Sequence, residues 1–192
     1  VREPAQLELA VQHAAATYGR LDVMVNNAGW HPPATTIDDT SPELFEAQLR
    51  LNLISTFLGS KFALPHLRKT RGCIIIMTSM VGLIGQRKAS AYCASKAGQI
   101  GFAKALAVEL SPAGIRVNCI CPSAVDTPLL HEWAASLPDP AEGLRQVDAM
   151  HALGRIATPA EIGRAALFLA TEDASFVTGQ ALAVDGGATL DY

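Results

Sequence analysis

The sequence predicts an α/β protein with a doubly wound parallel sheet, and three observations lead to this fold class. Short apolar stretches of strand length alternate with segments of helix length along the whole chain. Residues 73–77 are apolar at every position, as expected of a strand that helices cover on both faces. No low-complexity tract, repeat or linker divides the chain, so we expect a single domain over residues 1–192.

The expected elements alternate as helix and strand from one end of the chain to the other. Ser41 is a capping residue and Pro42 suits the first turn of a long helix, which Pro65 is expected to end or kink. Residues 122–150 show less regularity. The expected helices are residues 4–18, 42–64, 90–110 and 158–170. The expected strands are residues 21–25, 73–78, 115–121 and 180–184.

Composition and charge argue against several classes of protein. A net charge of -3 and a pI of about 5.9 provide no basic field for a nucleic-acid partner. No apolar run approaches the roughly 18 residues that a membrane span needs. Cys73, Cys119 and Cys121 fall in strand-like stretches, and no histidine has metal-ligand spacing with them. We therefore expect reduced thiols, no bound metal and, without a signal-peptide pattern, a cytoplasmic protein.

Tyr92 and Lys96 are the first candidates for chemistry. They lie four residues apart on an expected helix, so they share one helix face. A lysine ammonium beside a phenol favours the phenolate and lowers a pKa that is ordinarily about 10. Tyr92 would then act as a general acid and base; the alternative is a solvated lysine stacked on a helical tyrosine.

Two further polar residues interrupt apolar surroundings. Ser79 directly follows the expected strand at residues 73–78, where its hydroxyl either binds a substrate oxygen or serves as an ordinary turn serine. Asn52 lies between two leucines of an expected helix, where its amide must find partners. It either satisfies a local backbone irregularity or holds a water in a proton path.

A third group of candidates follows the first expected strand. Residues 26–29 (NNAG) end that strand with small side chains that let a ligand approach the backbone, or they form a simple turn. Trp30 and His31 come next and either line a pocket or lie on a surface loop. A serine hydrolase is disfavoured because the G-x-S-x-G nucleophile turn does not occur.

Taken together, these segments resemble the classical short-chain dehydrogenase/reductase family over nearly the whole chain. The segments that carry the resemblance are residues 21–29 (LDVMVNNAG), Asn52, Ser79, residues 92–96 (YCASK), residues 116–122 (RVNCICP), Thr127, Pro128, residues 177–180 (VTGQ) and residues 184–187 (VDGG). The resemblance implies a Rossmann-like fold and an NAD(P)-dependent oxidoreductase that transfers hydride between the nicotinamide and a secondary alcohol or ketone.

The resemblance also implies the role of each catalytic residue. Tyr92 exchanges a proton with the substrate oxygen, and Lys96 lowers the Tyr92 pKa and binds the nicotinamide ribose. Ser79 orients the substrate oxygen, and Asn52 holds a water that relays protons from Lys96. The cofactor is NAD or NADP. Besides Tyr92 and Lys96, the residues expected to bind it are Asn27, Ala28 and Gly29 at the adenosine ribose, and Pro122, Val125 and Thr127 at the nicotinamide.

Two departures from the family pattern modify these expectations. Position 123 is Ser where the family usually has Gly, and a positive φ there would cost about 1 kcal/mol. The glycine-rich turn that binds the pyrophosphate does not occur before Asn26. We therefore expect about the C-terminal two-thirds of the fold, N-terminally incomplete and unable to bind the dinucleotide by itself.

Two functions remain open from the sequence. One is the oxidoreductase; the other is a non-catalytic fragment or interaction subunit that lacks the pyrophosphate site. For the enzyme we expect a small-molecule alcohol or carbonyl substrate and, by resemblance, a homotetramer. Residues 122–150 are the expected substrate lid, and their apolar side chains suggest a partly apolar substrate. These side chains are Leu129, Leu130, Trp133, Leu137 and Leu144.

Overall fold

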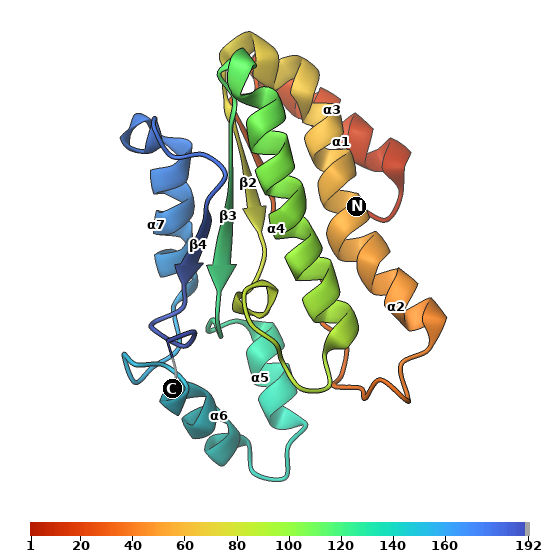
Figure 1. Cartoon of the computed structure of the whole chain (residues 1–192), viewed down its shortest axis with the longest axis vertical. Coiled ribbons are helices and arrows are strands. Elements are labelled where there is room, and N and C mark those ends of the chain that lie inside the picture. The colour runs from red at the N-terminus through yellow and green to blue at the C-terminus, as the bar shows by residue number, and fades with distance from the viewer. Residues whose placement is uncertain (191–192) are drawn as a thin grey trace.

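A parallel sheet forms the centre of the molecule. The computed structural model describes residues 1–190, and its strands lie in the order β1-β2-β3-β4 (Figure 1). All three strand pairs are parallel, and Ile76 of β2 lies opposite Asn26 of β1 and Cys119 of β3. The strands are β1 (Val23–Asn26), β2 (Cys73–Met77), β3 (Arg116–Pro122) and β4 (Ala181–Val184). Because all strands run the same way, their carboxyl ends share one edge of the sheet.

Helices cover both faces of this sheet, which confirms the predicted fold class. In Figure 1, α1, α3 and α4 lie on one side of the strands and α7 on the other. The helices are α1 (Pro4–Tyr18), α2 (Pro42–Gln48), α3 (Ser55–Thr70), α4 (Ser90–Leu110), α5 (Pro128–Ala135), α6 (Pro140–Ala149) and α7 (Pro159–Ala170). Along residues 1–190, none of them has the length and apolar character that crossing a bilayer requires.

Strand β2 explains why consecutive positions in the chain are apolar. Successive side chains of a strand point to opposite faces. Ile74 and Ile76 join the core under α3 and α4, where Leu67 and Leu106 are also buried. Ile75 joins the other core, against Ile162 and Leu169 of α7. Both faces of the strand are therefore buried, as the sequence indicated.

We expect Ile75→Ala to lower the free energy of unfolding by about 2–5 kcal/mol, since the side chain is 1% exposed and its removal leaves a cavity. Leu9→Ala is the matched control, because Leu9 is 62% exposed on α1 and should change stability by less than about 0.5 kcal/mol. Urea unfolding of both variants measures the difference. Equal midpoints for the two variants would contradict the assignment of Ile75 to the core.

The helix expected at residues 42–64 differs from the prediction in two ways. A π-helical turn, Leu49–Ile54, separates α2 from α3. The helix also continues through Pro65 to Thr70, so the first alternative, that Pro65 ends the helix, is wrong, and a kink at Pro65 stays a prediction. Pro65 and the preceding turn at Lys61 are exposed, so water can satisfy the carbonyl that the proline leaves without an N–H partner.

Residues 122–150 are more regular than the sequence suggested. They form α5 and α6, each of which has proline at its first position, Pro128 and Pro140. The Asp139 side chain accepts from the Glu142 backbone N–H at 2.9 Å and caps α6. These helices are short and most of their residues are exposed, so their sequence lacks the continuous apolar face that marks a core helix. Figure 1 places both beyond the carboxyl ends of β3 and β4.

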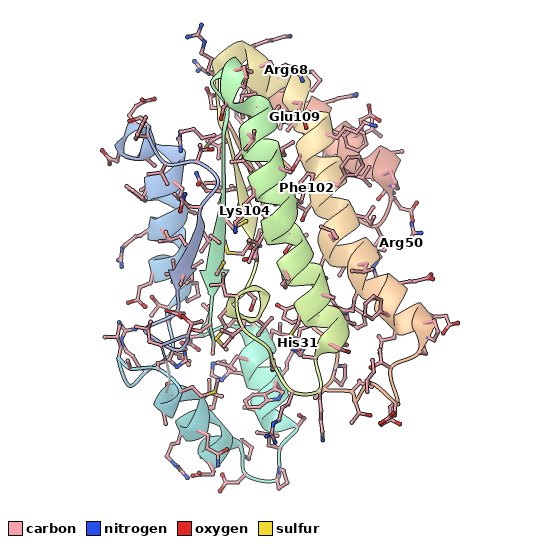
Figure 2. The ribbon with its side chains drawn as sticks, in the orientation of Figure 1. His31, Arg50, Arg68, Phe102, Lys104 and Glu109 are labelled. Atoms are coloured by element: carbon pink, nitrogen blue, oxygen red, sulfur yellow. The ribbon has the colours of Figure 1, made fainter. Side chains whose placement is uncertain are left out.

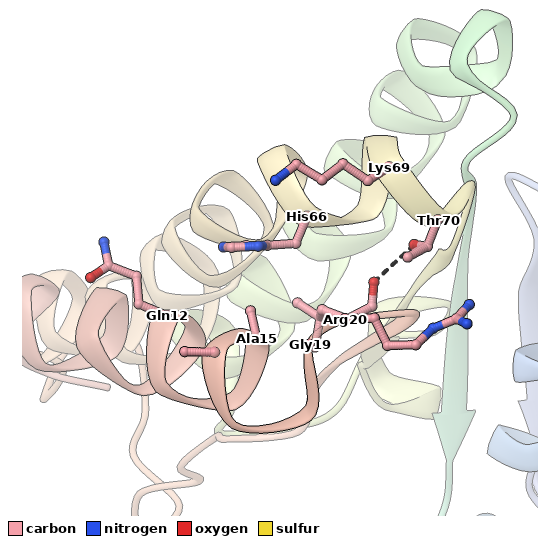
Figure 3. A pocket seen from close by; sticks show the side chains of 9 residues that line it. Gln12, Ala15, Gly19, Arg20, His66, Lys69 and Thr70 are labelled. Carbon is pink, nitrogen blue, oxygen red and sulfur yellow. Dashed lines mark hydrogen bonds between the residues drawn. The ribbon is translucent and has the colours of Figure 1, made fainter.

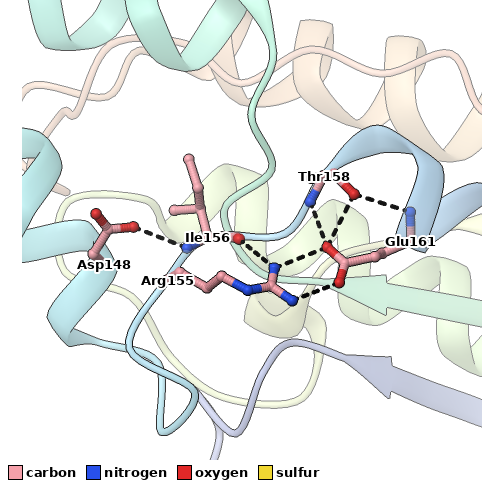
Figure 4. A network of polar contacts seen from close by, with 5 residues as sticks. All are labelled: Asp148, Arg155, Ile156, Thr158 and Glu161. Atoms are coloured by element: carbon pink, nitrogen blue, oxygen red, sulfur yellow. Dashed lines mark hydrogen bonds and ion pairs between the residues drawn. The ribbon is translucent and has the colours of Figure 1, made fainter.

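The start of α7 is fixed by a network of polar contacts (Figure 4). Thr158 and Glu161 form a capping box, as the sequence indicated. Arg155 donates to both carboxylate oxygens of Glu161, at 2.9 and 2.7 Å, and lowers the pKa of that carboxyl to about 2. Asp148, at the end of α6, accepts from the Ile156 N–H at 2.9 Å. The network therefore links the α6 end to the start of α7.

Candidate active site

The predicted catalytic residues approach one another at the carboxyl edge of the sheet. Asn27–Gly29 follow β1, Ser79 lies just beyond β2, and α4 begins at Ser90 near this edge and carries Tyr92 and Lys96. Parallel α/β sheets bind their ligands outside these strand ends. The fold itself therefore gathers residues that are far apart in the sequence.

Lys96 is buried, with 3% of its surface exposed. Its Nζ donates to the carbonyl of Met77, at the end of β2, over 3.0 Å, and lies 5.7 Å from the centre of the Tyr92 ring. Burial lowers the pKa of Lys96 to about 8, because desolvation disfavours the charged form. The alternative of a solvated surface lysine is therefore wrong.

Tyr92 is half-buried on the first turn of α4. Burial raises the pKa of its phenol above the ordinary value, and the neighbouring Ser79 hydroxyl acts in the opposite direction. The net shift is upward because burial outweighs the other contributions; the expectation that Lys96 favours the phenolate stays a prediction.

Ser79 has a structural role as well as a place in the site. It is the N-cap of a short 3-10 helix, Met80–Gly82, and its Oγ accepts from the Val81 N–H at 3.4 Å. The hydroxyl is the acceptor in that contact, so its hydrogen remains available for another acceptor. Of the two interpretations of Ser79, the turn serine is seen directly; its role on a substrate stays a prediction.

Asn52 is fully buried in the π-helical turn. Its Oδ1 accepts from the Trp30 N–H at 2.8 Å, and its Nδ2 donates to the Trp30 carbonyl at 3.0 Å. Nδ2 also lies 3.0 Å from Ser95 Oγ and from Gln48 Oε1. Asn52 therefore satisfies the irregular backbone after Gly29, which is one of the two readings of this residue, while its role in holding a water stays a prediction.

Sequence reasoning gave too little weight to His31. Its ring packs against Tyr92 edge to face, with 4.3 Å between the ring centres and 62° between the planes. The Nδ1 atom lies 2.6 Å from the Pro32 carbonyl, which fixes the ring orientation. Figure 2 shows His31 beside the first turn of α4. A loop histidine gives no periodic signal, so only the fold reveals this contact.

The residues expected to hold the cofactor line the same edge. Asn27 and Ala28 border a cavity of about 110 Å³ along β1, together with Ser55 and Thr56. Pro122 ends β3, Val125 makes an isolated bridge to Ala157, and Thr127 directly precedes α5. The Thr127 hydroxyl donates to the Val125 carbonyl at 3.2 Å. The two groups thus lie after β1 and after β3, at opposite sides of β2.

Two features of the structure fit a nicotinamide cofactor. The Lys96 ammonium has three donors and uses one of them on Met77, so others remain for ribose hydroxyls. A Cβ at Gly29 would lie 3.4 Å from both Lys96 Nζ and Asn52 Oδ1. Glycine therefore keeps open the approach to the lysine, as the predicted close contact with a ligand requires.

Ser123 has no positive φ, so the condition for that cost is not met. Among residues 1–190, the non-glycine residues with positive φ are Arg71 and Lys88. The loop after β3 therefore takes Ser123 in an ordinary conformation. Its hydroxyl lies 2.7 Å from His151 Nε2.

A separate cavity of about 270 Å³ lies away from this edge, between α1 and α3 (Figure 3). The Thr70 hydroxyl donates to the Leu21 carbonyl at 2.8 Å across its floor. Leu21 precedes β1, so this cavity lies at the amino ends of the strands. Its lining residues are Gln12, Ala15, Ala16, Gly19, Arg20, Leu21, His66, Lys69 and Thr70. None of the predicted site residues borders it.

Known proteins match the chain along its length. The family model described as enoyl-(acyl carrier protein) reductase matches residues 1–189. The L-fucose dehydrogenase of Bos taurus is 48% identical over 182 residues, which are 95% of this chain and 67% of that protein. The expectation of a missing N-terminal part is not confirmed by these matches.

Solved structures show the same fold. The ligand-free aldohexose dehydrogenase of Thermoplasma acidophilum has a TM-score of 0.93 and 33% identity, covering 100% of this chain and 76% of that one. The structure of ElxO with NADP bound has a TM-score of 0.90 and 29% identity, covering 99% and 76%. The family match and the dehydrogenase relatives leave no support for the non-catalytic alternative. The chain therefore belongs to the short-chain dehydrogenase/reductase family and is an oxidoreductase that uses NAD or NADP.

Proposed function

We propose that this enzyme oxidises a secondary alcohol at the carboxyl edge of the sheet, with Tyr92 as the general base. The observation that carries the proposal is the arrangement on α4, where the phenol of Tyr92 and the buried ammonium of Lys96 face one site beside Ser79. In the reverse direction Tyr92 is the general acid and protonates the oxygen of a ketone.

The reaction removes a proton from the hydroxyl oxygen and a hydride from the carbon that bears it. Tyr92 accepts the proton, and a carbonyl bond forms from the electron pair left on the oxygen. When bound, the nicotinamide accepts the hydride. The Ser79 hydroxyl donates to the substrate oxygen and holds it toward the phenol.

Lys96 and Tyr92 act as one titrating pair in this proposal. Because the pKa of Lys96 is lowered to about 8, the pair loses its first proton near that pH, and one proton then remains on one of the two side chains. The remaining donors of Lys96 bind the ribose. Asn52, whose Nδ2 lies 3.0 Å from the hydroxyl of Ser95, the residue before Lys96 on α4, passes the released proton onward through a water.

The cofactor is held on both sides of this pair. We assign the adenosine ribose to Asn27, Ala28 and Gly29, where small side chains border the groove along β1. We assign the nicotinamide to Pro122, Val125 and Thr127, in the loop after β3. Residues 122–150 form the lid over the substrate, and they place Trp133 and Leu129, 44% and 59% exposed, on its surface.

The substrate class that the relatives support is a sugar in its ring form. Two relatives that match nearly all of the chain are named for sugar substrates. They are the L-fucose dehydrogenase of Bos taurus and the aldohexose dehydrogenase of Thermoplasma acidophilum. A ring-form aldose presents a hydroxyl on a carbon that still bears a hydrogen, so it meets the requirement of the chemistry. We therefore propose an aldose as the substrate.

We further propose a cytoplasmic homotetramer. All four cysteines are free thiols, which supports a reducing compartment. Apolar side chains remain exposed on α3 and α4, notably Phe57 at 42% and Val108 at 78%. A second copy of the chain that packs helix against helix there would cover them. Light scattering of the complete gene product tests this assembly.

A substrate panel tests the proposed function. With NAD⁺ and NADP⁺ in turn, L-fucose, an aldohexose, cyclopentanol and an acyclic secondary alcohol are offered to the complete gene product. We expect reduced nicotinamide to form with a kcat/KM for the preferred aldose at least about tenfold above that for the acyclic alcohol, a difference of about 1.4 kcal/mol. Turnover of the simple alcohols alone would contradict the aldose assignment, and turnover of none would contradict the alcohol chemistry.

A further inference from the structure

Three chain segments meet around His151, beyond the carboxyl ends of β3 and β4. One is the loop that follows β3, another is the end of α6, and the third is the turn that follows β4. His151 is 4% exposed, although its neighbours Met150 and Leu153 are 52% and 70% exposed. A buried polar ring between exposed neighbours needs partners for both of its nitrogens.

Both ring nitrogens of His151 have partners. Nδ1 lies 2.8 Å from the carbonyl of Val147, which can only accept, so Nδ1 carries a proton. In the neutral ring Nε2 is then an acceptor, and it lies 2.7 Å from the Ser123 hydroxyl. Ser123 therefore donates to His151, and the bond joins the loop after β3 to the end of α6.

The turn after β4 completes the cluster. The Ser123 hydroxyl also lies 3.3 Å from the Asp185 carbonyl. The Asp185 carboxylate accepts from the backbone N–H groups of Gly187 and Thr189 and from the Thr189 hydroxyl, which fixes the turn. Gly186, with φ of +59°, lets the backbone pass the His151 ring, since a Cβ there would lie 3.4 Å from the ring.

Backbone hydrogen bonds also hold residues 153–157, which follow the lid segment 122–150. The Leu153 N–H donates to the Gly186 carbonyl at 3.0 Å, and the Ala157 N–H donates to the Ala124 carbonyl at 3.1 Å. The hydrogen bond between Ser123 and His151 adds a side-chain contact to these backbone bonds, and it joins the two ends of the lid segment. Ser123 lies at the start of residues 122–150, and His151 lies directly after them.

We propose that Ser123 and His151 are positioning residues that fasten both ends of the substrate lid together over the site. The proposal rests on the proposed function, in which residues 122–150 are the lid and the loop after β3 holds the nicotinamide. Without the bond, α5 and α6 leave their closed position for a larger fraction of the time. Neither side chain is assigned any contact with the reacting atoms.

This role predicts a change in KM without a matching change in kcat. If substrate binds the closed lid, its apparent affinity falls in proportion to the fraction of molecules that are closed. Saturating substrate restores the closed state, so kcat is retained. We expect Ser123→Ala and His151→Phe each to raise KM about tenfold, with kcat within about twofold of wild type.

Two further variants separate this role from simple packing. Gln at position 151 keeps an amide that can accept from Ser123, so His151→Gln should raise KM by no more than about threefold. The double variant Ser123→Ala with His151→Phe should raise KM by less than the product of the two single effects, because the bond between the two side chains can be lost only once. His13→Phe, at an exposed position of α1, is the matched control and should leave KM unchanged.

Hydrogen exchange of residues 128–149 gives a reading that does not depend on turnover. We expect the amides of α5 and α6 to exchange about tenfold faster in Ser123→Ala than in wild type, while those of α3 stay unchanged. If the wild-type enzyme turns over none of the offered alcohols, the proposed function is wrong. The hydrogen-exchange rates of α5 and α6 still decide whether Ser123 and His151 hold these helices in place. Unchanged exchange in the lid, or additive effects in the double variant, would overturn the proposal.

Discussion

We expect Tyr92→Phe to lower kcat by about two to four orders of magnitude while cofactor affinity and thermal stability stay close to wild type. The change removes only the phenolic oxygen, so the ring can still pack against His31, with the ring centres 4.3 Å apart. General acid and base catalysis contributes about 10²- to 10⁴-fold to a rate. The loss therefore falls on the chemical step and not on the fold.

Steady-state kinetics of the complete gene product with its preferred alcohol measures this effect. Tyr18→Phe is the matched control, because Tyr18 ends α1 and is 78% exposed. That variant should retain full activity. A Tyr92→Phe enzyme within a few-fold of wild type, in the presence of normal cofactor binding, would remove Tyr92 from the catalytic role.

Lys96→Met is expected to move the pH dependence of alcohol oxidation upward by about two units or more. In wild type the pair loses its first proton near pH 8, because burial lowers the pKa of Lys96 to about 8. Activity in the oxidative direction should therefore rise with pH up to about that value. Without Lys96, deprotonation falls on Tyr92 alone, whose pKa burial raises above its ordinary value of 10.0.

The size of the effect follows from this shift. Below both pKa values the fraction of deprotonated base falls tenfold per pH unit, so a shift of about two units lowers activity near neutral pH about 100-fold. Loss of the Lys96 donors should weaken cofactor binding at the same time. Profiles of kcat/KM against pH and fluorescence titration of the cofactor measure the two effects.

Lys104→Met supplies the control for this experiment. Lys104 is an exposed residue farther along the same helix, α4, so it carries the same change of charge without contact with Tyr92. Its pH profile should match that of wild type. A Lys96→Met profile that coincides with the Lys104→Met profile would show that the buried ammonium takes no part in the proton transfer.

The sequence was sufficient for most of the fold. Strand β2 was recognised because Ile74, Ile75 and Ile76 are consecutive and buried on both faces. The helix end predicted at Pro65 was wrong. An exposed helix face tolerates the hydrogen bond that the proline removes, so the helix continues. The π-helical turn at Leu49–Ile54 leaves no periodic signature that a sequence can display.

The site was predictable to a lesser degree, because it depends on contacts between distant segments. The spacing of Tyr92 and Lys96 placed both on α4, which the structure confirms. Spacing carries no information on how deeply the two side chains are buried, so it could not show that burial raises the pKa of Tyr92 and lowers that of Lys96. The contact of His31 with Tyr92 joins a loop to a helix, so only the fold could reveal it.

Ser123 shows a different limit of sequence reasoning. A serine in place of glycine suggested a strained loop, whereas the structure gives it a buried histidine as partner 28 positions along the chain. The role of Ser123 therefore depends on His151, and no local sequence pattern connects the two residues. Such pairs become visible only when both segments are placed on the same edge of the sheet.

The central claim is that the Tyr92 and Lys96 pair provides the base for alcohol oxidation. Its most direct test is the single-turnover rate of reduced nicotinamide formation, measured against pH for wild type and Tyr92→Phe with saturating cofactor and alcohol. The account predicts that the wild-type rate rises with a single ionisation near pH 8, and that the Tyr92→Phe rate is at least about 100-fold lower and independent of that ionisation. Equal rates with the same pH dependence in both enzymes would contradict it.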